Sequence, residues 1–272
     1  MVTHTQPDGS LKWTRRTTGE RMVRWFGWLV GVAVFVYAWN TISQATTWFF
    51  VWDAPRIAGD IFGRATPPRW SYIDKLWGPI WDTLNIATLG TIISLFLAVP
   101  VAFLAARNTT PSKMFIRPIA LLIIVSTRSI NSLIWALLLI AIIGPGVFAG
   151  IVAIAIRSIG FCAKLLYEAI EEINETQVEA ITATGGSRWQ VMVYGIVPQI
   201  LPAFAGIAVF RWDINIREST VLGLVGAGGI GLQLSASLNV LAWPQVTLIL
   251  LVILVAVVIG EWVSAKVRGA II

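Results

Sequence analysis

Arginines that stand in apolar sequence are the residues of this chain best suited to chemistry. Arg128 and Arg157 lie inside long apolar runs, and a mixed group of charges lies near the predicted external end of a later run: Arg211, Asp213, Arg217 and Glu218. A charged side chain in lipid is costly, so each of these residues is a candidate functional residue. The guanidinium is permanently charged and forked, which suits bidentate contact with an oxyanion. We therefore expect an anion to pass Arg217 and at least one of the two deep arginines.

A structural interpretation of the same charges carries about equal weight. The later cluster can neutralise itself by pairing, either Arg211 with Asp213 or Arg217 with Glu218. The two deep arginines can instead bond carbonyl groups at helix ends. These alternatives predict that the arginines hold helices together and bind no solute.

Hydroxylated residues and glycines follow Arg217. Ser219 and Thr220 can donate hydrogen bonds to oxyanion oxygens. Residues 226–231 then satisfy GxGxxG, but a dinucleotide site is rejected because no acid stands about twenty residues on and an apolar run follows almost at once. Two interpretations of the glycines in this segment remain. They can form a nest of N–H groups that binds the anion, or they can pack as a tight turn at the membrane edge. The glycines concerned are Gly226, Gly228 and Gly229.

A polar stretch, residues 174–202, lies between two long apolar runs. It carries helix-start and helix-stop signals in order: Thr176 with Glu179, Gly185 with Gly186, and Ser187 with Gln190. The sequence therefore predicts a helix of about two turns between hinges, within a knob over residues 174–188. Such a knob suits docking into another protein and passing on its movement. The alternative, that Glu179 only caps its own helix, is compatible with this role.

Residues for catalysis or metal binding are scarce. The chain has one histidine, His4, and one cysteine, Cys162, and it lacks the GxxxxGK[ST] phosphate loop. A Ser/His/Asp set, a thiolate metal site and an ATP-binding loop are all excluded on these grounds. We expect a non-catalytic protein without a cofactor of its own, so any ATP, with its Mg²⁺, must be bound and used by a partner.

The composition indicates a membrane protein. Of 272 residues, 57% are hydrophobic and 12% are charged, and the mean hydropathy is +0.78. That is too little charge for a soluble domain. The formal charge of +6 comes from short basic clusters beside apolar runs, which favours topology signals over nucleic-acid binding.

Six apolar runs are each near the ~20 residues that a membrane-spanning helix needs. They cover residues 25–46, 83–106, 118–143, 147–167, 189–212 and 245–265. The sequence thus predicts an all-α, polytopic membrane protein. We expect four parts: a cytoplasmic tail over 1–24, unstructured over 1–20, a first anchor helix over 25–52, a tryptophan-rich external loop over 53–82, and a transmembrane domain over 83–268 that contains the knob.

The distribution of lysine and arginine predicts the orientation of the spans. The tail carries five of these residues, Lys12, Arg15, Arg16, Arg21 and Arg24, and the 107–117 loop carries three. The 144–146 loop carries none. Both termini and the knob should therefore be cytoplasmic.

The knob resembles the EAA loop of ABC-importer permeases. The likeness rests on Glu179, Ala180, Gly185 and Pro198, although Ile181, Gly195 and Val197 depart from the usual Ala, Ile and Leu. In that family the loop grips the ATPase subunit. The resemblance therefore implies ATPase coupling through Glu179, Ala180, Gly185 and Gly186.

Further blocks are similar to permease subunits of phosphonate importers. They are residues 81–108, 133–138 with 148–150, 164–173, 214–220 and 221–231. The likeness covers about 81–268 and implies a type I ABC importer permease (MetI-like) fold, a permease homodimer, two ATP-binding subunits and an external solute-binding protein. Ile130-Asn131 stands where a Pro-Glu pair is expected, so phosphonate, phosphite and phosphate all remain candidate solutes.

These observations together predict the multi-pass permease subunit of an ATP-driven importer in the bacterial plasma (inner) membrane, moving phosphonate or a related phosphorus oxyanion. The alternative is an ion-coupled secondary transporter of an anion. That mechanism needs membrane-buried acids or histidine, and within the six predicted spans the acid is Glu261.

Overall fold

The computed structural model of the chain describes residues 2–5, 7, 9, 11–14 and 18–271. The chain divides into two compact units, residues 1–62 and 63–272. Two of the five basic residues assigned to the tail, Arg15 and Arg16, lie outside the described residues.

The first unit begins with a β-hairpin, in which β1 (Val2–Thr5) pairs antiparallel with β2 (Leu11–Thr14). Two helices follow, α1 (Thr18–Ala45) and α2 (Trp48–Ala65). The prediction that residues 1–20 are unstructured is therefore wrong, since this stretch contains the hairpin and the first residues of α1. Helix formation needs no apolar residues, and Glu20 in the first turn of α1 favours the helix N-terminus.

The segment 53–82, predicted as an external loop, is mostly helical. Helix α2 covers its first part, a 3-10 helix η1 (Trp70–Lys75) lies further on, and the next long helix begins at Trp77. The charged residues of α2 recur at helical spacing on one face, and Arg56 forms a bidentate pair with Asp53. The amino-acid composition of the segment suggested a loop because composition does not register the helical spacing of the charged residues.

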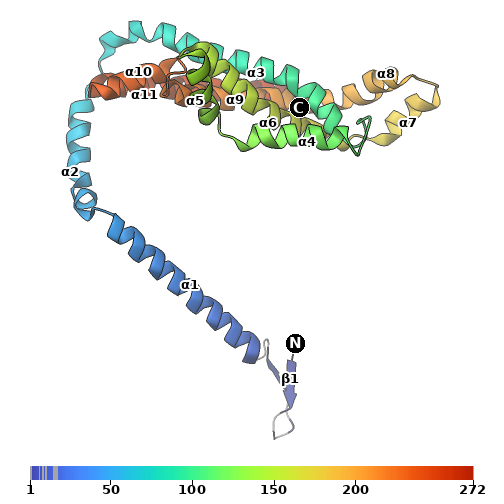
Figure 1. The fold of residues 1–272 in the computed structure, drawn as a ribbon, viewed down its shortest axis with the longest axis horizontal. Helices are drawn as coiled ribbons and strands as arrows, with labels where there is room; N and C mark the ends of the chain where they lie inside the picture. Colours follow the sequence, from blue (N-terminus) through green and yellow to red (C-terminus); the bar gives the residue numbers. More distant parts are fainter. Residues whose placement is uncertain (1, 6, 8, 10, 15–17, 272) are drawn as a thin grey trace. The chain divides into compact units, whose positions relative to one another are not determined.

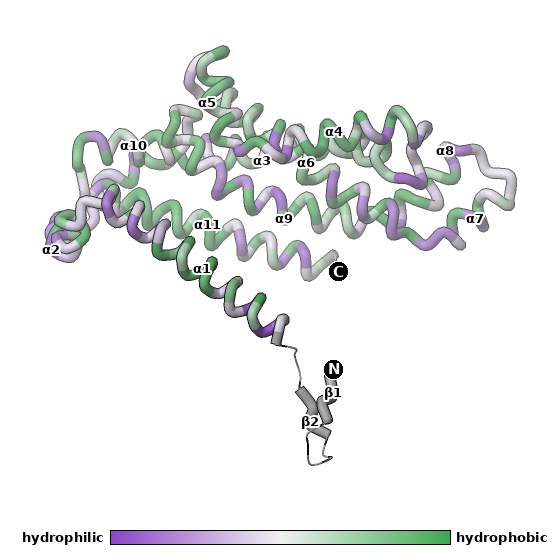
Figure 2. The backbone as a smooth tube through the Cα atoms, turned by 60° about the horizontal axis from the view of Figure 1, so that its bottom comes forward, coloured by the Kyte–Doolittle hydropathy of each residue, from purple (hydrophilic) through white to green (hydrophobic). Residues whose placement is uncertain are grey.

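The second unit is built from helices. After η1 they are α3 (Trp77–Ala105), α4 (Ile116–Ser129), α5 (Ser132–Ile143), α6 (Val147–Glu171), α7 (Glu175–Ala183), α8 (Arg188–Gln190), the π-helical η2 (Val191–Ile196), α9 (Val197–Gly223), α10 (Ile230–Asn239) and α11 (Trp243–Ile271). Among the described residues, five helices can cross a membrane by length and composition, or six spans if α4 and α5 form one. The prediction of an all-α protein with about six spans is confirmed, and Figure 2 shows the hydrophobic sequence along these helices.

The predicted straight span over 118–143 is broken. Helices α4 and α5 meet at 88°, with Ile130 and Asn131 in extended conformations between them. The Asn131 side chain accepts a hydrogen bond from the N–H of Leu133 at 3.0 Å, so it caps the start of α5. This local cap competes with helix continuation and produces the bend.

The predicted span over 189–212 is longer than expected. The helix runs from Arg188 through η2 into α9 and ends at Gly223, so the whole cluster from Arg211 to Glu218 lies inside it. The prediction that Arg217 lies just after the end of this span is therefore corrected. One ion pair with α6 and others within α9 allow these charges to remain in the helix.

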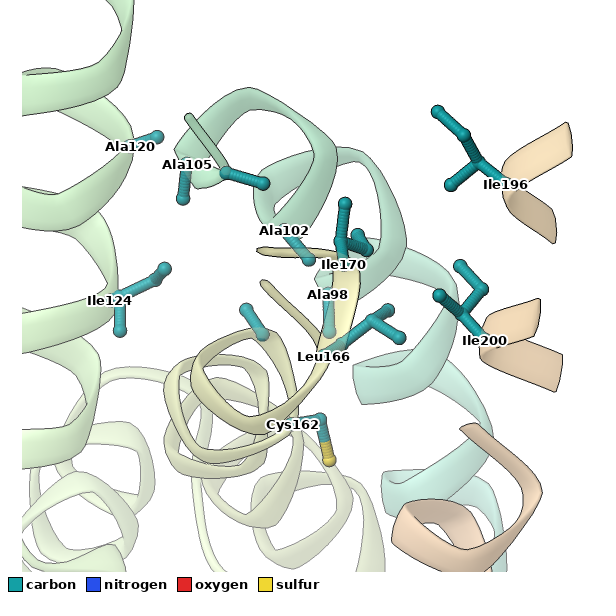
Figure 3. Packing of buried hydrophobic residues seen from close by; sticks show 12 residues of the cluster. Ala98, Ala102, Ala105, Ala120, Ile124, Cys162, Leu166, Ile170, Ile196 and Ile200 are labelled. Carbon is teal, nitrogen blue, oxygen red and sulfur yellow. The ribbon is translucent and has the colours of Figure 1, made fainter. Parts of the chain in front are cut away.

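Helices α3, α6 and α9 pack together at the centre of the second unit (Figure 1). Small residues permit close approach, as Ala98, Ala102 and Ala105 of α3 do in the core shared with α4, α6 and α9 (Figure 3). One close helix contact joins α6 to α4. A Cβ placed on Gly160 of α6 would lie 2.3 Å from Thr127 Oγ1 and 2.6 Å from the Ile124 carbonyl oxygen.

We predict that Gly160→Ala destabilises the protein by about 1 to 3 kcal/mol, because the added methyl group meets α4 backbone that cannot move freely. The matched control is Gly206→Ala in α9, where a new Cβ meets nothing within 4 Å. That variant should be neutral or slightly stabilising, since alanine favours a helix over glycine by about 1 kcal/mol. Thermal unfolding midpoints in detergent measure both effects, and equal midpoints for the two variants would refute the packing account.

Candidate functional site

The knob begins at Asn174. Its Oδ1 accepts a hydrogen bond from the Thr176 N–H at 3.0 Å, and α7 starts at Glu175. The predicted capping box between Thr176 and Glu179 is therefore wrong, because Thr176 already lies in the first turn. Asn174 is an equally good N-cap by residue type, so the helix starts two residues earlier than predicted.

A glutamine that the sequence argument did not select attaches the knob to α9. Gln199 Oε1 accepts from the Asn174 N–H at 2.9 Å, and Gln199 Nε2 donates to the carbonyl oxygens of Asn174 at 3.4 Å and Gly195 at 2.6 Å. One side chain thus satisfies backbone groups at the start of α7 and at the end of η2. No local spacing rule predicts it, because the bonded residues are 25 positions apart.

The far end of the knob turns at Gly185, whose φ is +80°. A Cβ there would meet nothing within 4 Å, so the conformation alone demands glycine. After Gly186, the Ser187–Gln190 capping box is confirmed: the Ser187 N–H donates to Gln190 Oε1 at 2.8 Å, and the Gln190 N–H donates to Ser187 Oγ at 3.4 Å. The chain then returns in η2, against which Val178 and Ile181 of α7 pack at Gly195.

Glu179 and Ala180 lie exposed on α7. Among the described residues Glu179 makes no ion pair, so its carboxylate is available to another protein. Figure 2 shows that α7 and α8 stand at one end of the second unit, where hydrophilic residues gather. The geometry is that of a short helix with an exposed face, fixed at its base and turned by a glycine.

A buried polar network joins α3, α6 and α9 inside the membrane-spanning region. Arg211 is 2% exposed, and its Nε donates to Ser158 Oγ at 2.8 Å. Ser158 Oγ in turn donates to Asn215 Oδ1 at 3.3 Å, and Asn215 Nδ2 donates to Thr91 Oγ1 at 2.7 Å. Sequence reasoning missed the last three residues, since neutral polar residues in apolar runs are common and the signal lies in their mutual placement.

The ion pairs differ from both predicted pairings. Glu218 is held by two arginines, by Arg157 of α6 and by Arg211 at 3.4 Å, and Arg217 pairs with Asp213 one turn before it. A helix places residues four apart on one face, which explains Arg217 with Asp213 and excludes Arg217 with its neighbour Glu218. Arg157 was not predicted to pair, because its partner is 61 residues away.

Three arginines against two carboxylates leave one positive charge in this cluster. Arg157, Arg217 and Glu218 line one depression between α5, α6 and α9, together with Asn131 and Ser132. The Arg217 side chain is half exposed, so its guanidinium is accessible from the depression. We call this the outer depression.

The other predicted pathway residues are not part of the outer depression. Ser219 is fully buried and its hydroxyl donates to the Ile216 carbonyl oxygen at 2.8 Å. The Thr220 hydroxyl donates to helix carbonyl oxygens of Ile216 and Arg217. Arg128 lines a separate depression between α4 and α6.

The glycine segment packs as a tight turn. Gly226, Gly228 and Gly229 have φ values of +99°, +83° and +73°. A Cβ on Gly229 would lie 2.6 Å from Thr83 Oγ1, and that oxygen accepts the Ile230 N–H at 2.8 Å. Close packing against α3 therefore accounts for this glycine without a bound anion. Within the described part of the chain, no group of three or more His, Cys, Asp or Glu residues is placed to hold a metal ion.

Comparison with known proteins identifies what the chain is similar to. Residues 87–268 match the family described as "Binding-protein-dependent transport system inner membrane component". The phosphite transport system permease protein PtxC of Stutzerimonas stutzeri is 39% identical, covering 88% of this chain and 85% of that one. The phosphate-import permease protein PhnE of Mycolicibacterium smegmatis is 35% identical over 90% of this chain, which spans 46% of that relative.

Among solved structures, an inward-facing MetNI methionine ABC transporter has a chain with the same fold. It superposes with a TM-score of 0.65 over 75% of this chain and 99% of its own, at 20% sequence identity. The match confirms the predicted type of permease fold.

Proposed function

Because the chain belongs to the family of inner-membrane components of binding-protein-dependent transport systems, we propose that it forms the membrane pathway of an importer for phosphorus oxyanions: phosphonate, phosphite or phosphate. Family membership makes it a multi-pass, non-catalytic permease of an ABC transporter, in which a separate subunit uses ATP. The solute class is supported by the names of the relatives, which include phosphite and phosphate permeases.

The observation that carries the proposal is the surplus positive charge of the outer depression. Arg217 is half exposed there beside Arg157, and both present planar forks that fit tetrahedral oxyanions. Arg128, which lines the separate depression between α4 and α6, supplies a third cation. A pathway of successive weak sites suits a protein that must release its solute as well as bind it. We also assign to the pathway the hydroxyl residues and glycines that follow Arg217 in the chain: Ser219, Thr220, Gly226, Gly228 and Gly229.

The proposed assembly contains two copies of this chain, two ATP-binding subunits and an external binding protein. The knob is its ATPase-coupling surface, with Glu179 and Ala180 in contact and Gly185 and Gly186 as the hinge. Both termini and the knob face the cytoplasm, in agreement with the basic residues beside the spans.

We predict that the double change Glu179→Ala, Gly185→Val reduces capture of the ATP-binding subunit by at least about tenfold, since strain of about 1 to 3 kcal/mol at a positive φ misplaces α7. Pull-down from solubilised membranes measures how much of the ATP-binding subunit is captured. The control is Gly27→Val in α1, a glycine without positive φ and with open space around it, which should bind normally. Undiminished capture by the double variant would remove the knob from the interface.

Cysteine labelling tests the orientation. In a Cys162→Ala background, Ser112→Cys should resist an impermeant thiol reagent applied from outside, whereas Thr66→Cys should react. The opposite pattern would invert the topology.

Uptake by the reconstituted complex tests the proposed solute and the role of Arg217 together. We expect ATP-dependent uptake of at least one of phosphite, phosphate and methylphosphonate, and none of methionine. Arg217→Gln should lower uptake about tenfold or more, because a hydrogen bond to a charged group contributes about 1.5 to 3 kcal/mol. Arg217→Lys should fall between, since it keeps the charge but loses the fork.

The matched control is Asp213→Asn, which removes the partner of Arg217 and leaves the guanidinium in place. It should transport near the wild-type rate if Arg217 contacts the solute. Equal loss of assembly in Asp213→Asn and Arg217→Gln would favour a purely structural ion pair, and wild-type uptake in both Arg217 variants would take that residue out of the pathway.

A further inference from the structure

The depression that holds Arg128 contains further groups suited to an anion. Its lining includes Arg128 and Ser129 from the end of α4 and Lys164 and Tyr167 from α6. Lys164 and Tyr167 were not among the predicted pathway residues. Two cations and a phenol hydroxyl thus face one hollow between two membrane helices, which we call the inner depression.

Close packing of α4 on α6 fixes the position of these groups. A Cβ on Gly160 would lie 3.0 Å from the backbone nitrogen of Arg128, so the last turn of α4 rests directly on α6 at that level. Lys164 stands four residues further along α6, which is one turn on the same face. The two cations are therefore brought together by a contact that only glycine allows.

The charged groups of the inner depression have few partners within the protein. Among the described residues, the Arg128 guanidinium and the Tyr167 hydroxyl make no hydrogen bond, and Arg128 makes no ion pair. Lys164 pairs with Glu168 at 3.4 Å, but both side chains are more than a third exposed. Such exposed pairs contribute little, so an oxyanion can displace Glu168 from Lys164.

The inner depression is aligned with the outer one along α6. Arg157 and Lys164 are seven residues apart, so they lie on the same face of α6 and about 10 Å apart along its axis. Phe161 stands between them, with its ring 5.1 Å from the Arg211 guanidinium. The α6 face thus presents a cation in each depression, separated by an aromatic side chain.

We propose that Arg128, Lys164 and Tyr167 form a second, inner binding site for a tetrahedral phosphorus oxyanion, reached after the outer depression. Arg128 and Lys164 neutralise the anion, and the Tyr167 hydroxyl donates to one of its oxygens. Lys164 returns to Glu168 when the anion leaves, which keeps the site weak enough to release it. This assignment rests on the proposed function, since it concerns the same solute class.

The same chemistry would also suit the phosphate of an anionic lipid headgroup. The free oxyanion is favoured because the site shares a helix face with the outer depression. The experiment therefore uses the intact complex, with its ATP-binding subunits and binding protein, in two kinds of vesicle: pure phosphatidylcholine, and phosphatidylcholine mixed with phosphatidylglycerol. Uptake of labelled inorganic phosphate, phosphite and methylphosphonate is measured in each.

We expect Arg128→Gln and Lys164→Gln each to lower uptake about tenfold or more in both kinds of vesicle, on the usual contribution of a charge-assisted hydrogen bond. Lys164→Arg should restore most of the loss. Tyr167→Phe, which removes one hydroxyl group and keeps the ring, should lower uptake severalfold with normal assembly. Stimulation of ATP hydrolysis by the loaded binding protein should stay near normal, which a folding defect would not allow. Lys266→Gln and Arg268→Gln, near the end of α11, are the matched controls and should transport normally.

Wild-type uptake in Arg128→Gln, Lys164→Gln and Tyr167→Phe would overturn the inner site while leaving the proposed function intact. Loss of uptake confined to vesicles that contain phosphatidylglycerol would assign the site to a lipid headgroup and equally overturn it. If the wild-type complex takes up none of the three anions, the proposed function itself fails, and the inner site fails with it.

Discussion

The membrane core depends on one interaction, the double ion pair that Glu218 forms with Arg157 and Arg211. Each of these groups alone would be prohibitive among apolar helices, whereas together they neutralise most of their charge and join α6 to α9. Arg211 is almost fully buried, and Ser158 satisfies its remaining face. Removing Glu218 would leave the buried Arg211 and the partly exposed Arg157 without an acidic partner, so the arrangement is constrained as a unit. The bundle of α3, α6 and α9 is built around it.

This pairing also determines what the pathway can recognise. The two carboxylates compensate two of three arginines, so the outer depression keeps one positive charge and an accessible guanidinium at Arg217. In the proposed pathway, an anionic solute would neutralise this remaining positive charge. The α9 helix carries Asp213 and Glu218 inside a span, where the sequence analysis expected no acid. Both are paired with arginine, so they are poorly suited to carry protons.

Much of the fold was predictable because it depends on local patterns. The lengths of the apolar runs predicted most of the membrane spans. Gly185 and the Ser187–Gln190 pair located the turn of the knob. The errors arose where local and distant effects compete. Asn131 caps α5 and bends a run that hydropathy treats as one span, and Asn174 replaces Thr176 as the start of α7. The partners of Arg157 and Gln199 are 61 and 25 residues distant, so only the assembled helices reveal them.

The energy source of transport tests the central claim most directly. Vesicles that contain the complete complex can be given internal ATP without an ion gradient, and vesicles that contain this chain alone can be given a proton or sodium gradient without ATP. The account predicts uptake of a phosphorus oxyanion in the first case, dependent on the external binding protein, and none in the second. Gradient-driven uptake by the chain alone would contradict it and would identify an ion-coupled transporter.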